Sequence, residues 1–136
     1  MEKRRNPLRQ LAGALTGLAG AFAALVVFGC ELPPGARVES ERIAISYRTV
    51  PAQILVGQPF ALELAACPKQ GAAVSGHVKL DAHMPEHRHG MNYRINVVPL
   101  GAGRFHSEGW LFHMPGRWEF LFDVGAERLT HSVRIE

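Results

Sequence analysis

Short runs of β-forming residues follow one another along residues 43–136, and Gly, Pro and Asn separate them. None of these runs repeats its apolar residues with the helical period. In the run 77–83, apolar and polar residues alternate, and the run 117–124 alternates well, with Trp118, Phe120, Phe122 and Val124 inward and Trp118 as a core aromatic. The spacing predicts an all-β, immunoglobulin-like antiparallel β-sandwich of about seven strands in one domain. The expected strands are 43–48, 59–66, 77–83, 93–98, 103–112, 117–124 and 128–135.

The N-terminal segment has the pattern of an export or anchoring signal. A basic flank precedes an apolar stretch that runs from Leu11 to Gly29 and ends at Cys30. A Cys at this place is typical of a bacterial lipoprotein signal, in which it is lipidated and becomes the mature N-terminus. The apolar stretch also approaches the ~20 residues that span a bilayer, so an uncleaved anchor is the alternative. Either one predicts a membrane-anchored protein on the periplasmic side, outside the cytoplasm.

The domain boundaries follow from this pattern. We expect a signal or anchor over 1–30, a tether over 31–42 that contains Pro33-Pro34-Gly35, and a folded domain over 43–136. The formal net charge of +3 comes entirely from the leader. A neutral domain with scattered charges gives no footprint for nucleic acid.

The two cysteines leave alternatives open. If Cys30 is lipidated, Cys67 has no partner, and we interpret it as a small buried apolar residue. If Cys30 is not lipidated, a disulfide between the two becomes available in an oxidising compartment.

The segment 83–91 is dense in His and Met, and it predicts a metal site. Imidazole suits several transition metals, whereas thioether sulfur favours Cu(I), and a mixed set can hold both copper oxidation states. Zinc is a lesser option because Asp81 and Glu86 lie nearby. In an extended segment, residues two apart project to the same side, which would let two imidazoles bind one ion. The candidate ligands are His83, Met84, His87, His89 and Met91.

A second cluster, His113-Met114-Pro115-Gly116, repeats the His-Met-Pro order of residues 83–85. Loops at one end of a sandwich gather in space, so the two turns can meet, and His113 or Met114 would then complete the coordination shell. The competing interpretation is that both segments are ordinary solvated turns and that Met84 fills a gap beside the core. Three isolated histidines read as surface polar residues: His77, His106 and His131.

Catalysis finds little support in the sequence. Ser107 lies beside His106, and Asp123 occurs elsewhere, but no strained turn presents the serine as a nucleophile. No Gly-rich phosphate loop connects a strand to a helix. We therefore expect a protein that is not an enzyme.

The segments 81–91 (DAHMPEHRHGM) and 103–119, which contains FHMPGRWE, carry a family resemblance. Together they resemble the YtkA-like domain, related to FixH-type proteins, over about residues 58–135. The resemblance implies an immunoglobulin-like sandwich, exported or membrane-anchored, with roles in copper handling or in the assembly of respiratory oxidases.

A weaker likeness is to periplasmic copper chaperones of the PCuAC type, whose ligands are His-Met, a later Met, and a final His-x-Met after 21 residues. Twenty-one residues also separate Met91 from His113. However, only six residues lie between Met84 and Met91 where that family has ten, and no residue separates His113 from Met114. The site of that family is therefore not carried over.

Two functions remain. The first is a membrane-anchored accessory protein that holds or delivers copper, to a respiratory oxidase or a copper-trafficking protein. The second is a metal-free interaction module, in which the His/Met loop and the region of Trp110 or Trp118 dock a partner from a membrane complex.

Overall fold

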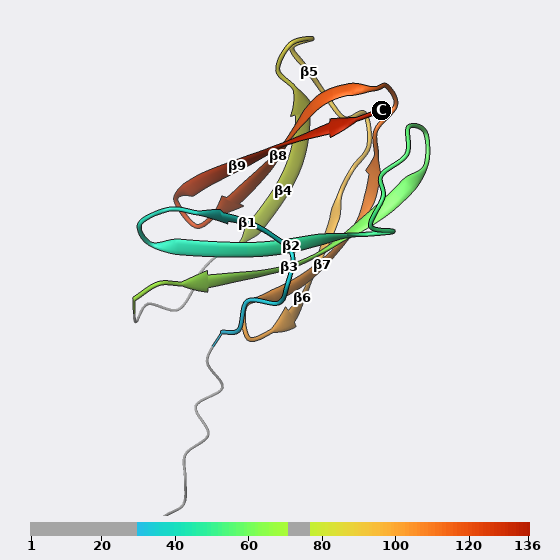
Figure 1. Ribbon diagram of the computed structural model, residues 1–136. Helices are drawn as coiled ribbons and strands as arrows, with labels where there is room; N and C mark the ends of the chain where they lie inside the picture. The colour runs from blue at the N-terminus through green and yellow to red at the C-terminus, as the bar shows by residue number, and fades with distance from the viewer. Residues whose placement is uncertain (1–29, 71–76) are drawn as a thin grey trace, which may run out of the picture.

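The computed structural model describes residues 30–70 and 77–136, and it forms two antiparallel sheets that face one another (Figure 1). The five-stranded sheet has the order β1-β2-β3-β7-β6, and its strands are β1 (Ala36–Glu39), β2 (Ile43–Val50), β3 (Pro59–Pro68), β7 (Arg104–Leu111) and β6 (Asn96–Gly101). The four-stranded sheet has the order β5-β4-β8-β9, and its strands are β5 (His89–Gly90), β4 (Val78–Met84), β8 (Gly116–Val124) and β9 (Glu127–Ile135).

The prediction of an immunoglobulin-like sandwich is confirmed. The order β2-β3-β7-β6 corresponds to strands ABED of that fold, and β4-β8-β9 corresponds to CFG. All seven expected strands are present with small shifts at their ends. Two short strands, β1 and β5, were not expected, and each adds one strand to the edge of a sheet.

The strand β1 corrects the expected tether. Residues 36–39 pair with β2, with Val38 opposite Ile45, so the folded domain begins before residue 43. Ala36 and Val38 are half-buried and pack against the core, while the charged residues that alternate with them, Arg37 and Glu39, are exposed. Only two apolar residues carry this alternation, which is too short a pattern to distinguish a strand from a linker.

Aromatic side chains dominate the core between the sheets. Trp118, Phe120 and Phe122 of β8 are fully buried, as their alternation predicts. Tyr47 of β2 packs against Phe120 and Phe122, and its hydroxyl shares a hydrogen bond of 2.6 Å with Nδ1 of His131. His131 is therefore half-buried and joins the two sheets, and the expectation of an isolated surface residue is wrong.

A disulfide joins Cys30 to Cys67, with a Cα–Cα distance of 5.4 Å. Cys67 is buried as expected. Of the two alternatives for its sulfur, the structure has the disulfide with Cys30 and not the unpaired thiol. A sulfur in a disulfide cannot also carry a thioether-linked lipid, so this pairing excludes lipidation of Cys30 in the same molecule. The disulfide in this structure therefore contradicts the prediction that Cys30 carries a covalent lipid.

The predicted leader, residues 1–29, lies outside the described residues. Within residues 30–70 and 77–136, no helix has the length and apolar character that a membrane crossing requires.

Candidate metal centre

The segment between β4 and β5 is a tight turn, not an extended strand. Residues 85–88 form the turn, Arg88 adopts a positive φ of 53°, and the N–H of His87 donates to the carbonyl of Met84 at 3.2 Å. The predicted extended geometry of this segment is therefore wrong. Even so, the turn keeps the imidazoles of His87 and His89 close, with their ring centroids 5.8 Å apart.

The second His-Met turn meets the first. The chain leaves β7 at Leu111 and enters β8 at Gly116, and between them His113 places its ring centroid 5.2 Å from that of His89. The prediction that the two turns meet in space is confirmed. His89 is the central ring of the three, because both His87 and His113 are its neighbours.

Trp118 forms the floor under this cluster. Its indole lies 6.0 Å from the ring of His89 and 5.5 Å from the ring of His113, centroid to centroid, and both imidazoles are nearly perpendicular to it. Phe112 stacks on the indole at 4.3 Å, and the indole N–H donates to the carbonyl of Met114 at 3.0 Å. The indole is thus fixed by one stacking contact and one hydrogen bond.

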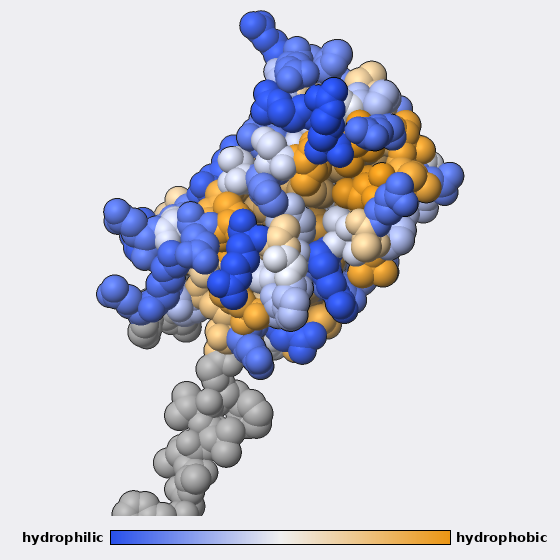
Figure 2. Space-filling model, in the orientation of Figure 1, coloured by the Kyte–Doolittle hydropathy of each residue, from blue (hydrophilic) through white to orange (hydrophobic). Residues whose placement is uncertain are grey.

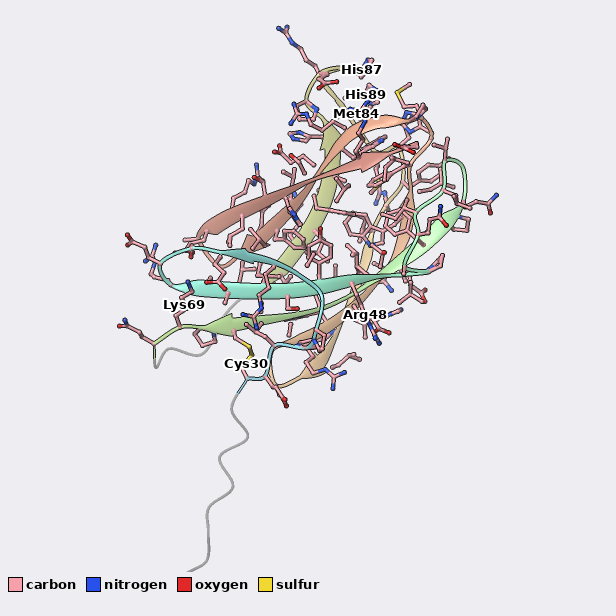
Figure 3. All side chains as sticks on the ribbon, viewed as in Figure 1. Cys30, Arg48, Lys69, Met84, His87 and His89 are labelled. Carbon is pink, nitrogen blue, oxygen red and sulfur yellow. A yellow bond between two sulfur atoms is a disulfide. The ribbon has the colours of Figure 1, made fainter. Side chains whose placement is uncertain are left out.

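The thioethers lie on the core side of the cluster. Met84 is fully buried and is the cross-strand partner of His89, so the two side chains leave the sheet on the same face (Figure 3). Met91 and Met114 are half-buried and pack against the hydrophobic core. The interpretation of Met84 as a gap filler beside the core agrees with its burial, whereas Met91 and Met114 combine partial exposure with proximity to the turns.

His83 does not join the cluster. It lies on the outer face of the four-stranded sheet, because successive residues of a strand alternate in direction and Met84 points inward. Its Nε2–H donates to the carboxylate of Glu119 at 2.8 Å. The structure therefore separates His83 from the other four residues proposed in segment 83–91, and its outward position follows from the polar face predicted for this strand.

The neighbouring carboxylates are engaged elsewhere. Glu86 pairs with Arg117 at 3.2 Å, Glu119 accepts from His83, and Asp81 accepts from the backbone N–H of Ala82 at 2.8 Å. These contacts leave the imidazole and thioether groups as the donors that face the cluster. An ion held there would therefore have soft or borderline ligands rather than oxygen ligands.

The imidazoles are neighbours but have not converged on one point. Among residues 30–70 and 77–136, no three His, Cys, Asp or Glu side chains are grouped closely enough to hold an ion as they stand. Two imidazoles that bind one ion at about 2.0–2.1 Å in tetrahedral geometry have centroids about 5 Å apart. The 5.2 Å separation of the His89 and His113 centroids matches that spacing.

A backbone contact orients the central ring. Nδ1 of His89 lies 3.2 Å from the carbonyl oxygen of Gly90, and because that oxygen can only accept, the hydrogen bond requires the proton on Nδ1. This tautomer leaves the lone pair on Nε2 free for a metal. Sequence reasoning missed the hydrogen bond between His89 and the carbonyl of Gly90, and it missed the contacts of Trp118 with His89 and His113. No pattern in the sequence indicates either feature.

The residues with triad composition do not form a catalytic site. The hydroxyl of Ser107 is buried and accepts from the indole N–H of Trp110 at 2.8 Å. His106 contacts Glu108, and Asp123 forms two hydrogen bonds with Arg128, which hold the pKa of that carboxyl below its usual value. The three groups are thus engaged with separate partners.

The two tryptophans are unsuited to docking a partner. Trp110 is 1% exposed and Trp118 is 0% exposed, so neither presents a surface.

Comparison of the chain with protein-family models, with curated proteins and with solved structures gives no match. The resemblance to the YtkA-like domain therefore stays a prediction from the two motifs.

Proposed function

We propose that this protein is an extracytoplasmic, membrane-anchored accessory protein that binds copper through its two His-Met turns. The observation that carries the proposal is the meeting of His87, His89 and His113 above Trp118, from segments that are more than twenty residues apart in the chain. His87 and His113 lie on connections and His89 begins the two-residue strand β5, at the loop end of the sandwich where binding groups are commonly found.

The donor set supports copper over the hard cations. Three imidazoles with thioethers beside them suit copper, and calcium or magnesium would need oxygen ligands that the cluster does not offer. Exposure of His87 and His113 leaves the ion accessible from solvent, which suits holding and handing on a metal more than retaining it permanently. A respiratory oxidase under assembly or another copper-trafficking protein is the proposed recipient.

Metal titration tests the proposal. The soluble domain, residues 30–136 with its disulfide intact, is titrated anaerobically with Cu(I) and, separately, with Cu(II) and Zn(II), against chromophoric competitors. We expect one equivalent of copper to bind and the double variant His87→Ala/His89→Ala to bind at least about 100-fold more weakly, since removing ligands or their supporting groups typically costs 10- to 100-fold each.

His83→Ala is the matched control, because it removes an imidazole from the same segment but from the opposite face of the sheet. Its copper affinity should equal that of the unmodified domain. Equal loss of binding in the control and the double variant would show that the ligands are assigned wrongly. Absence of copper binding in the unmodified domain would overturn the proposed function itself.

A metal-free interaction module is the second candidate, and exposed apolar residues favour it. Val50, the last residue of β2, and Leu55, in the connection to β3, are 45% and 49% exposed. That connection reaches the start of the second His-Met turn through a hydrogen bond of 2.8 Å from Gly57 N–H to the carbonyl of Phe112. On the face shown in Figure 2, apolar surface lies directly beside the polar tip of the β4–β5 turn. Recovery of a partner that persists in the presence of a chelator and is lost in Leu55→Glu would support this candidate over copper binding.

A further inference from the structure

We propose that the indole of Trp118 is itself part of the ion site, and that it makes the site selective for Cu(I). This inference rests on the proposed copper-binding function and adds to it a non-coordinating aromatic partner and an oxidation state. Trp118 is the third residue of β8, and its indole is stacked on Phe112 and contacts the imidazoles of His89 and His113.

The distances place the indole within reach of a bound cation. The ring centroids of His89, His113 and Trp118 form a triangle with sides of 5.2, 5.5 and 6.0 Å. A point midway between the two imidazoles is therefore about 5 Å from the indole centroid, inside the limit of about 6 Å for a cation–π interaction. An ion bound by both rings at about 2.0–2.1 Å lies about 2 Å from that midpoint. It is therefore within about 6 Å of the indole centroid on every side of the midpoint except the side that faces away from Trp118.

The indole is also held rigidly enough to act in this way. Its stacking on Phe112, with an interplanar angle of 12°, and its hydrogen bond to the carbonyl of Met114 fix both its plane and its rotation. That carbonyl belongs to the same turn as His113, so the position of the second imidazole is tied to the position of the indole. Trp118 therefore both positions His113 and faces the ion.

The surroundings favour a soft monovalent ion. An indole interacts with a cation through its π electrons and offers no lone pair, so it cannot replace a ligand that Cu(II) or Zn(II) requires. The nearest carboxylates, Glu86 and Glu119, are paired with Arg117 and His83. Cu(I) is satisfied by two or three soft ligands, and imidazole, thioether and an aromatic face supply an environment of that kind.

Tryptophan fluorescence tests this inference, because the chain has only two tryptophans. In Trp110→Phe, Trp118 is the sole reporter, and we expect its emission to change in proportion to added Cu(I), or to Ag(I) as a redox-stable soft analogue, and to saturate at one equivalent. In Trp118→Phe, Trp110 is the sole reporter and is equally buried, hydrogen-bonded to Ser107 and away from the imidazoles. Its emission should not change, and the Cu(I) affinity of this variant should fall by about fivefold to thirtyfold.

The outcomes separate the inference from the proposed function. Cu(I) that binds by competition assay but leaves the emission of Trp118 unchanged overturns the inference and leaves the function standing. No binding of Cu(I) by the unmodified domain overturns both. The measurement on Trp110→Phe does not require Trp118→Phe to fold, so a folding defect in the second variant does not prevent the test.

Discussion

The two ends of the sandwich are held in different ways. At one end, which we call the disulfide end, Cys30 is bonded to Cys67, and Glu127 accepts hydrogen bonds from Ser40 and Arg42. At the other, the histidine end, the turns that carry His87, His89 and His113 are held by hydrogen bonds and by packing on Trp118 (Figure 3). The covalent link thus stabilises the end opposite the proposed site, whereas the histidine turns are held by non-covalent contacts.

The largest effect should come from removing the disulfide. With a sequence separation of 37 residues, loop-closure entropy predicts that Cys30→Ala/Cys67→Ala lowers the free energy of unfolding by about 4 kcal/mol. Urea unfolding measures this change. Copper affinity, measured at a temperature where the variant is still folded, should change less than about twofold, since effects of distant sites are usually independent. A parallel loss of copper binding in the folded variant would show that the two ends are coupled.

Gly116→Ala should perturb the histidine end alone. Gly116 has a φ of +130°, and an added Cβ would lie 2.7 Å from the terminal methyl of the buried Met84. Backbone strain of this kind costs about 1–3 kcal/mol, and the side chain of Met84, the cross-strand partner of His89, would have to move. We expect a loss of stability by thermal unfolding together with weaker copper binding.

Gly101→Ala is the matched control at the disulfide end. Gly101 also has a positive φ, of +87°, but an added Cβ meets no atom within 4 Å. It should lose stability through backbone strain alone and keep its copper affinity. If Gly101→Ala weakened copper binding as much as Gly116→Ala does, the separation of the two ends would be wrong.

A smaller effect concerns Tyr47, which lies in the core that both ends share. Burial raises the pKa of the Tyr47 hydroxyl above its ordinary value of 10.0. The unfolded chain therefore ionises first as pH rises, so the stability from Tyr47 is fully present below about pH 10 and is lost above it, by at most about 1.4 kcal/mol per pH unit.

The alkaline slope should be flatter in Tyr47→Phe than in the unmodified protein, because the variant lacks the buried hydroxyl. Urea unfolding between pH 9 and 11 measures both slopes. Because Tyr47 contacts Phe120 and Phe122 in the shared core, both ends should lose stability together. An unaltered slope in Tyr47→Phe would show that the buried hydroxyl does not control alkaline unfolding.

Much of the fold could be predicted from the sequence because several of its strands, β4 and β8 above all, bury alternate side chains. Residues 116–124 bury every second side chain, and Trp118 is a core residue as expected. The proximity of the two His-Met turns could also be predicted, since loops at one end of a sandwich lie close together in space. These predictions rest on local patterns that the tertiary structure reinforces.

The remaining features depend on contacts between distant residues. The strand β1 carries only two apolar side chains, and β5 has two residues, so neither has a detectable period. The partner of Cys67 was ambiguous, because the signal that ends at Cys30 fits both lipidation and pairing. Trp118 was predicted as core, but its contact with His89 joins β8 to β5, and no spacing in the chain encodes that pair.

The disulfide also shortens the flexible linker between the leader and the folded domain. Only five residues separate Cys30 from the start of β1 at Ala36, and both points are fixed to the five-stranded sheet. If the leader holds the chain at a membrane, the domain has almost no free linker on which to swing. The strand β7 runs from the disulfide end to the histidine end over eight residues, about 23 Å. The two His-Met turns would then stand at a fixed height above the bilayer, and any partner that receives an ion from them would have to present its acceptor at that height.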